Sequence, residues 1–186
     1  MSFSHKGLEN TPYERKESDI RRVFFIKQNK KIIDERISPH GLQQIDIADD
    51  GNCLFRSVSL QLYGLQDRHL DIRAKVKAFM ESDKESLLQF FDSMDKLEQY
   101  IDKMSREARW GDDLTLRCVA EKFQVEIHVL TNEVENFYKH FKPTFSQETK
   151  DVSHRHLFLS HVPPMHYQPI CTDKTFHRLR SVKDLA

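Results

Sequence analysis

The sequence predicts one domain of the α+β class, with helices early in the chain and strands late. In the middle of the chain, apolar residues recur every three or four positions, as they do on the buried face of a helix. After position 124 they alternate with polar residues instead, which is typical of strands. The length of 186 residues and the hydrophobic share of 38% are enough for one packed core.

The N-terminal part is expected to contain one helix and a short extended segment. Apolar positions mixed with basic ones predict a helix over 18–37, and a breaker sequence at 38–41 ends it. Apolar residues within 42–47 favour a short strand or an extended lead-in. The chain is therefore divided into an N-terminal extension, partly helical, at 1–37, a main domain at 38–172 and a C-terminal tail at 173–186.

Helical spacing dominates the sequence from residue 53 to residue 123. Leu54, Val58 and Leu62 lie four apart, and Gly64 supplies the stop that commonly follows a helix. A polar turn ending in Asp112 and Asp113 provides a cap for the last of these helices. The expected helices cover 53–63, 67–80, 84–106 and a segment running from the 110–113 turn to Phe123.

Strands are expected in the last third of the chain. Val125, Ile127 and Val129 alternate as strand residues do, whereas 131–153 is polar and is interpreted as a long excursion. Two further strands are predicted at 157–159 and 166–170, joined by a tight connection that contains two prolines.

Composition excludes several classes of protein. The 29 basic and 29 acidic side chains cancel, which argues against nucleic acid or an anionic membrane as a partner. Three widely spaced cysteines form neither a disulfide framework nor a zinc motif, and no apolar run is long enough for a signal peptide or a membrane span. We expect a monomeric protein of a reducing cytosol, or one delivered to a host cytosol if its source is a pathogen or symbiont.

Cys53 is the strongest candidate for a nucleophile. It follows the polar turn Asp49-Asp50-Gly51-Asn52 and opens a helix, whose positive end favours a thiolate. Backbone N–H groups of Gly51 and Asn52 are candidates for an oxyanion hole. The other cysteines lack this context: Cys118 lies in an apolar helical pattern and Cys171 follows a strand, so both are interpreted as structural.

His166 is the best candidate for the base among the 10 histidines. It follows a Pro-Pro turn and begins a strand, where a side chain is firmly held. The pair His154 and His156 has metal-ligand spacing, but no acidic or thiol ligand lies near it in sequence. We therefore expect neither a metal nor a cofactor.

The run from Asp50 to Val58 resembles the nucleophile motif of the ovarian-tumour (OTU) domain cysteine proteases. His166-Tyr167, after a strand at 157–160, is similar to that family's closing strands and catalytic histidine. The resemblance covers about Ile45 to Ile170, in the family's order. Further matching segments are Gln61-Leu62-Tyr63-Gly64, Arg68-His69, Ile72-Arg73 and Trp110-Gly111 with Leu114, Leu116 and Ala120.

This resemblance implies a papain-like OTU fold, with a small central sheet flanked by helical regions. It also implies a thiol-dependent ubiquitinyl hydrolase that cleaves the isopeptide bond after the C-terminal glycine of ubiquitin in chains or conjugates. Carried onto this chain, Cys53 is the nucleophile, His166 is the base and Asp50 matches the motif aspartate, with the oxyanion held around Gly51 and Asn52.

One position departs from the family pattern. Members commonly carry Asp or Asn two residues after the histidine, where this chain has Gln168. The amide of Gln168 is a candidate for orienting the imidazole, and Asp46 is another candidate for the third residue. The departure keeps an alternative open, namely an OTU-like module that binds ubiquitin or a ubiquitin-like modifier with weak or no hydrolysis.

Overall fold

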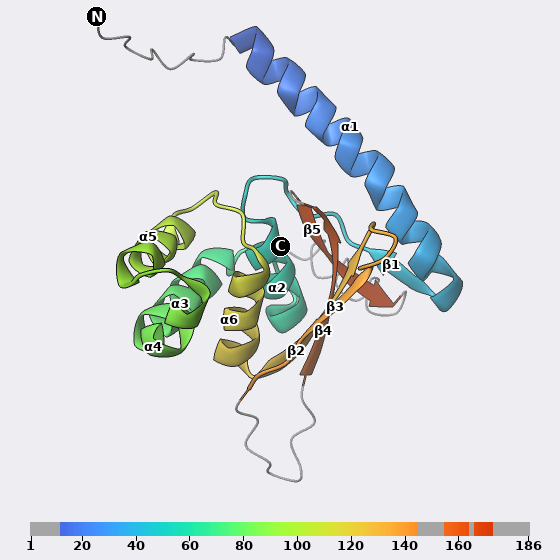
Figure 1. The fold of residues 1–186 in the computed structure, drawn as a ribbon. Coiled ribbons are helices and arrows are strands. Elements are labelled where there is room, and N and C mark those ends of the chain that lie inside the picture. Colours follow the sequence, from blue (N-terminus) through green and yellow to red (C-terminus); the bar gives the residue numbers. More distant parts are fainter. Residues whose placement is uncertain (1–11, 145–154, 164–165, 173–186) are drawn as a thin grey trace, which may run out of the picture.

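The computed structural model describes residues 12–144, 155–163 and 166–172. The helices are α1 (Pro12–Ile37), α2 (Cys53–Tyr63), α3 (His69–Ser82), α4 (Lys84–Leu87), α5 (Met94–Ser105) and α6 (Asp113–Phe123), with single 3-10 turns η1 (Ser38–His40) and η2 (Leu88–Phe90). The strands are β1 (Leu42–Gln44), β2 (Val125–Thr131), β3 (Tyr138–Phe141), β4 (Arg155–Val162) and β5 (His166–Thr172). The α+β class predicted from sequence is confirmed (Figure 1).

The strands form one mixed sheet in the order β1-β5-β4-β2-β3. β2 and β4 are parallel, with Ile127 opposite Leu157, and the other neighbours are antiparallel. β5 therefore lies in the sheet interior, between β1 and β4. Its first residue, His166, pairs with Val162 at the end of β4.

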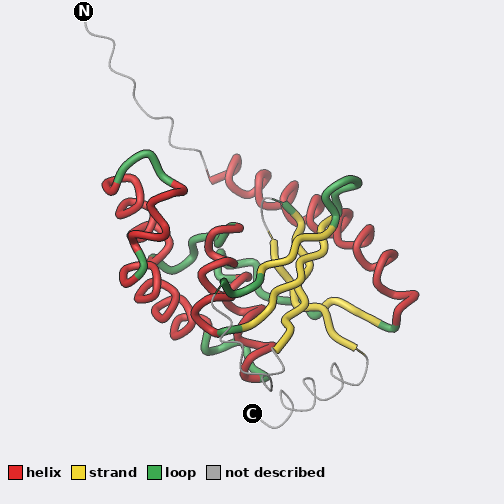
Figure 2. The backbone as a smooth tube through the Cα atoms, turned by 60° about the horizontal axis from the view of Figure 1, so that its bottom comes forward, coloured by secondary structure: helices red, strands yellow, loops and turns green. Residues whose placement is uncertain are grey.

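The main core lies between the sheet and the helices α2 and α6, with α3, α4 and α5 stacked outside them (Figures 1 and 2). Leu54 and Val58 of α2 are completely buried, as are Leu116 of α6 and Ile127 of β2. Each such side chain contributes about 1.5–3 kcal/mol through removal from water. This packing fixes the start of α2 against β5.

The C-terminal half of α1 packs on the opposite face of the sheet. Ile33 and Ile37 form a second apolar cluster with Val162 of β4 and Ile170 of β5. Further toward the N-terminus, Phe24 is exposed, and this part of α1 projects beyond the sheet (Figure 1). None of the described helices is long and apolar enough to cross a membrane.

The structure corrects several expected boundaries. The single helix expected over 84–106 is interrupted, because Phe91 is extended and the Ser93 side chain accepts the Lys96 N–H to start α5. β3 lies within the expected excursion, and its edge position is held by pairing with β2. The first helix starts earlier than expected, at Pro12, and β1 is shorter than the extended segment expected over 42–47. Residues 145–154, which hold the end of the excursion expected over 131–153, the end of the Pro-Pro connection (164–165) and the tail (173–186) lie outside the described residues.

Candidate active site

Cys53 is the first residue of α2 and is almost completely buried, at 1% exposure. Asn52 precedes it as the N-cap. The backbone N–H of Tyr167 in β5 points at the sulfur, with 3.5 Å between N and Sγ. A residue 114 positions downstream is thereby brought into contact with the candidate nucleophile, and the neighbour of that residue is His166.

The surroundings of Cys53 favour the neutral thiol, contrary to the expectation of a thiolate. Burial raises the pKa of Cys53 to about 11, and the nearby carboxylates of Asp49 and Asp50 act in the same direction. The N–H groups of Tyr167 and Leu54 lower that pKa, but they do not outweigh desolvation. The position at the helix start is therefore insufficient by itself to ionise the sulfur.

His166 is 4% exposed, and its Nδ1 lies 3.5 Å from Oδ1 of Asp49. This separation suits an ion pair but is longer than a good hydrogen bond. Burial lowers the pKa of His166 below its usual value, and the positive charge of Arg22 adds to this, while Asp49 opposes it. The imidazole is therefore neutral at pH 7, which is the form that accepts a proton.

Asp49 is the residue that reasoning from the sequence missed. The same oxygen that faces His166 also accepts a hydrogen bond from the guanidinium of Arg22 in α1. The only available signal was the doublet Asp49-Asp50, and the motif match directed attention to the second of the pair. Which carboxylate faces the imidazole depends on how the turn bends, and the sequence pattern did not reveal that.

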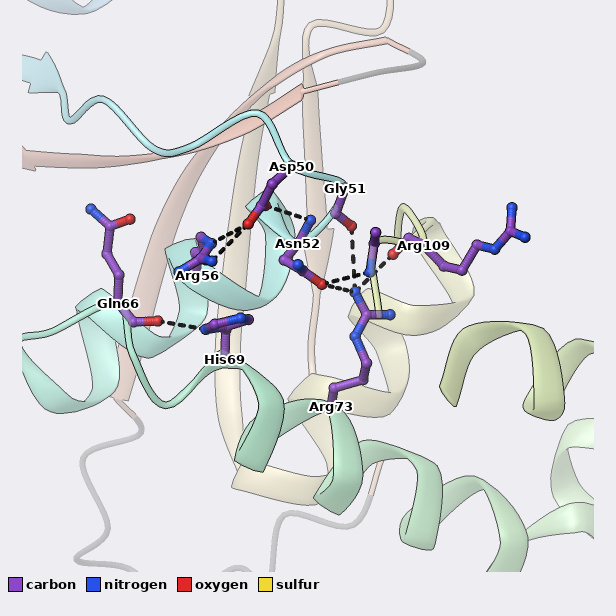
Figure 3. Close-up of polar contacts among 9 residues, drawn as sticks. Asp50, Gly51, Asn52, Arg56, Gln66, His69, Arg73 and Arg109 are labelled. Carbon is purple, nitrogen blue, oxygen red and sulfur yellow. Dashed lines mark hydrogen bonds and ion pairs between the residues drawn. The ribbon is translucent and has the colours of Figure 1, made fainter. Parts of the chain in front are cut away.

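Asp50 holds the nucleophile turn together. Its Oδ2 accepts from Nε and Nη2 of Arg56 at 3.0 and 2.6 Å, and its Oδ1 accepts the backbone N–H of Asn52 at 3.0 Å (Figure 3). Burial acts to raise the pKa of Asp50, but these hydrogen bonds together lower it to about 2. Both carboxylate oxygens of Asp50 accept hydrogen bonds from groups in the turn and in α2. Asp50 therefore stabilises the turn and does not orient the imidazole.

Gly51 and Asn52 fit tightly against the segment before α6. Gly51 has φ +78°, and a Cβ there would lie 2.3 Å from the carbonyl oxygen of Ala108, so no larger residue fits. The Asn52 side-chain oxygen accepts from the Ala108 N–H at 3.1 Å and from Arg73 at 2.7 Å. The Asn52 N–H is already directed at Asp50, so it must leave that partner before it could bind an oxyanion.

Arg73 of α3 is a buried support of this turn, 3% exposed. Besides Asn52, its guanidinium donates to the carbonyl oxygens of Arg109 at 2.9 Å and Gly51 at 3.4 Å (Figure 3). It also donates to the carbonyl oxygen of Met104 at 2.9 Å. It also lies over the ring of Phe55, 4.0 Å from the centroid. Ile72-Arg73 is among the segments of the family resemblance, but nothing in the sequence pattern indicates the role of Arg73 in supporting the turn.

Gln168 is buried on β5, two residues after His166. Its amide donates to Oδ1 of Asp46 at 3.2 Å, and Asp46 in turn accepts a hydrogen bond from Lys30 of α1 at 2.6 Å. The hydrogen bond of Lys30 is the largest contribution that lowers the pKa of Asp46. The two sequence candidates for the third residue thus contact each other, and Asp49 is the carboxylate paired with the imidazole.

A nucleophile turn closed by Asp50, with a cysteine at a helix start and a histidine strand against it, is the arrangement expected of a papain-like thiol protease. The sequence model of the family described as OTU-like cysteine protease matches residues 48–167. The chain belongs to this family.

Curated relatives and solved structures agree with that membership. The chain is 36% identical over 135 residues to OVARIAN TUMOR DOMAIN-containing deubiquitinating enzyme 10 of Arabidopsis thaliana, covering 73% of this chain and 36% of the relative. It is 30% identical over 136 residues to enzyme 12 of that plant, covering 73% of this chain and 59% of the relative. It therefore spans only part of the length of these relatives.

The fold is also that of solved OTU domains. The OTU domain of OTUD1 superposes with a TM-score of 0.66 at 18% identity, covering 81% of this chain and 99% of that one. An OTU domain solved in complex with ubiquitin has a TM-score of 0.53 at 17% identity, covering 72% and 71% of the two chains. The fold class implied by the sequence resemblance is confirmed.

Proposed function

We propose that this chain is a cysteine-type deubiquitinase, a thiol-dependent ubiquitinyl hydrolase that cleaves the isopeptide bond after the C-terminal glycine of ubiquitin. The observation that carries the proposal is the 3.5 Å contact between the Tyr167 N–H and the sulfur of Cys53, which sets the start of β5 against the start of α2. The relatives named as deubiquitinating enzymes supply the substrate class.

In the proposed reaction, His166 takes the proton of the Cys53 thiol as the sulfur attacks the glycine carbonyl. Collapse of the tetrahedral intermediate breaks the C–N bond, and the imidazolium returns the proton to the departing lysine amine. Water then attacks the thioester, again with His166 as the base, and releases the ubiquitin carboxylate and the thiol. Proton transfer accompanies attack, because the thiol and the imidazole are both neutral beforehand.

Backbone N–H groups at Gly51 and Asn52 are proposed to stabilise the oxyanion. The Asn52 N–H donates to Asp50 at 3.0 Å, and Asp50 also has the two hydrogen bonds from Arg56. Because Arg56 keeps the carboxylate satisfied, the N–H can turn to an oxyanion at modest cost. Asp50 then acts as a positioning residue, and Asp49 acts on the charge of His166.

The site is closed in this state, since Cys53 is 1% and His166 4% exposed. Part of the protein around the site must therefore move before the C-terminal tail of ubiquitin can reach the sulfur. Arg22 of α1 contacts Asp49 and lies 4.6 Å from the ring centroid of Trp110, so α1 bridges the turn before Cys53 and the segment before α6. We propose that residues 38–172 form the catalytic unit, with the C-terminal half of α1 packed on it.

The test is a panel of di-ubiquitins of every linkage, incubated with the parent protein, Cys53→Ala and Cys171→Ala. We expect cleavage by the parent and by Cys171→Ala, whose cysteine is also buried but lies near the end of β5. Cys53→Ala should be inactive with an unchanged melting temperature. Cleavage that persists in Cys53→Ala would refute the assignment of the nucleophile.

A ubiquitin-binding module with little turnover is the second candidate. It is favoured by the contact of Gln168 with Asp46, which leaves the family's usual third position unavailable to the imidazole. Measurable affinity for ubiquitin without cleavage of any linkage would support it. Probes built on ubiquitin and on ubiquitin-like modifiers, compared in parallel, show which of the two the protein recognises.

Ubiquitin or polyubiquitin chains are the proposed partners, engaged by a monomer in the cytosol. Cys53, Cys118 and Cys171, which all lie among the described residues, form no disulfide, as suits a reducing compartment. A thiol, an imidazole and backbone donors account for every step of this reaction without a metal or cofactor.

A further inference from the structure

Four side chains with metal-ligating atoms gather on the face of the sheet opposite α2 and α6, away from Cys53. Glu126 and His128 lie two apart on β2, so they share a face of the sheet. In the strand register His140 of β3 is opposite His128, and His156 of β4 is opposite Glu126. Directly opposed residues have neighbouring side chains, so three strands bring the four groups together.

Glu126, His128 and His140 have donor atoms close enough to share one ion, and His156 lies beside two of them. Nε2 of His140 lies 2.7 Å from Oε2 of Glu126, and Nε2 of His128 lies 2.8 Å from Nδ1 of His156. The two pairs are linked by 3.9 Å between Nδ1 of His156 and Oε2 of Glu126. Ligand atoms of Glu126, His128 and His140 all lie within 4.8 Å of one another. Donors of a tetrahedral zinc ion, bound at about 2.0–2.1 Å, are about 3.3 Å apart.

The orientation of the central imidazole is fixed by a group that is not itself a proposed ligand. The Tyr138 hydroxyl lies 2.7 Å from Nδ1 of His128, so Nε2 is the nitrogen turned toward His156. The ring is also stacked between neighbours, with centroids 4.3 Å from His140 and 4.7 Å from Phe158. Metal-bound histidines usually have such a partner on the second nitrogen.

The cluster is sheltered but accessible from solvent. The side chain of Glu126 is 17% exposed, that of His140 24% and that of His156 46%. A divalent ion entering from solvent can therefore reach the imidazole nitrogens and the carboxylate, which bind metal in their deprotonated forms.

We propose that Glu126, His128, His140 and His156 bind one divalent transition-metal ion of the zinc type. Three imidazole nitrogens and one carboxylate suit Zn²⁺ and related ions, whereas Mg²⁺ and Ca²⁺ prefer oxygen ligands. The ion takes the place of the direct contact between Nε2 of His128 and Nδ1 of His156. It ties the edge strand β3 to β2 and β4, and its role is structural.

Of the four proposed ligands, only His156 is indicated by the sequence alone. It forms a pair with His154 that has no acidic or thiol ligand near it in sequence. The missing ligands come from β2 and β3, and β3 was not predicted at all. This inference is independent of the proposed function, because it concerns the opposite face of the sheet.

The test measures Zn²⁺ binding by the full chain in competition with a chromogenic chelator. A Cys53→Ser background removes the candidate active-site thiol as a competing ligand. His128→Gln and Glu126→Gln remove one ligand each, and His40→Gln is the control. His40 is exposed in η1, beside β1 at the far edge of the sheet from β3. Glu126→Gln keeps the shape of the side chain. If His128→Gln folds poorly, the affinity of Glu126→Gln for Zn²⁺ tests the site by itself.

We expect one equivalent of Zn²⁺ in the background protein and the His40→Gln control, and affinity reduced by more than about tenfold in each ligand variant. Zn²⁺ should also raise the melting temperature of the background protein but not that of Glu126→Gln. Bound Co²⁺ should show tetrahedral ligand-field bands without a thiolate charge-transfer band. Equal affinity in all variants, no binding of Zn²⁺, or a thiolate band would overturn the assignment.

Discussion

Oδ1 of Asp49 contacts both the candidate base and a cation: it lies 3.5 Å from Nδ1 of His166 and accepts a hydrogen bond from Arg22. Asp49 raises the pKa of His166, whereas Arg22 lowers it. The protonation of the candidate base therefore depends on a carboxylate in the turn before Cys53 and on a cation of α1. Each of the two can be removed separately.

Asp49→Asn is expected to reduce kcat/KM for di-ubiquitin by about tenfold or more, because the imidazolium formed in the transition state loses its counter-charge. Removal of that charge also lowers the pKa of His166, so the acid limb of the pH profile should move to lower pH. Gln168→Ala, which removes an amide bonded to Asp46, should change kcat/KM by less than about threefold. A larger loss in Gln168→Ala than in Asp49→Asn would assign the third position to the glutamine.

Arg22→Ala should move the acid limb in the opposite direction. Removal of a positive charge raises the pKa of His166, so the base becomes protonated, and activity is lost, at a higher pH than in the parent. The pH dependence of kcat/KM measures this shift. Lys31→Ala is the control, since Lys31 is exposed on the same helix and forms an ion pair with the exposed Glu35. A shift to lower pH, or an equal shift in the control, would contradict the assigned role of Arg22.

In the absence of ubiquitin, the rate at which Cys53 is alkylated should keep increasing with pH above the range in which an ordinary thiol ionises. With a pKa of about 11, only about one thiol in 10⁴ is ionised at pH 7. The measurement is the rate of iodoacetamide modification at Cys53, followed by peptide mass spectrometry from pH 5 to pH 10. A plateau that begins below pH 7 would instead indicate a preformed thiolate–imidazolium pair.

Arg73→Met is expected to lower the free energy of unfolding by about 3 kcal/mol or more. The substitution leaves the buried oxygens of Asn52 and Met104, and the partly buried carbonyl oxygen of Arg109, without a charged donor. Denaturant unfolding measures the change, and Arg68→Met is the control because Arg68 is exposed at the start of the same helix. A loss no greater than in the control would mean that the turn is supported elsewhere.

The sequence was most informative where local signals agreed. The helix at 53–63 has the predicted bounds, because its apolar spacing is regular and Gly64 takes the left-handed conformation that ends it. Cys53 and the strand of His166 were found because each has a distinctive local context. Their contact across 114 positions came from the family resemblance, not from periodicity.

The features that were missed depend on partners far along the chain. β3 exists because its residues pair with β2, and its short sequence has no apolar alternation of its own. Asp49 and Asp50 are chemically identical, and only the fold directs one to His166 and the other to Arg56. The raised pKa of Cys53 has the same origin, since helix position predicted a thiolate and tertiary burial reverses that effect.

The most direct measurement is the reaction of the full chain with ubiquitin that carries a C-terminal electrophile, followed by mapping of the modified residue. The account predicts one ubiquitin per chain, attached to Cys53, with labelling strongly slowed in His166→Ala. Attachment at Cys118 or Cys171, or labelling that persists in Cys53→Ala, would contradict it.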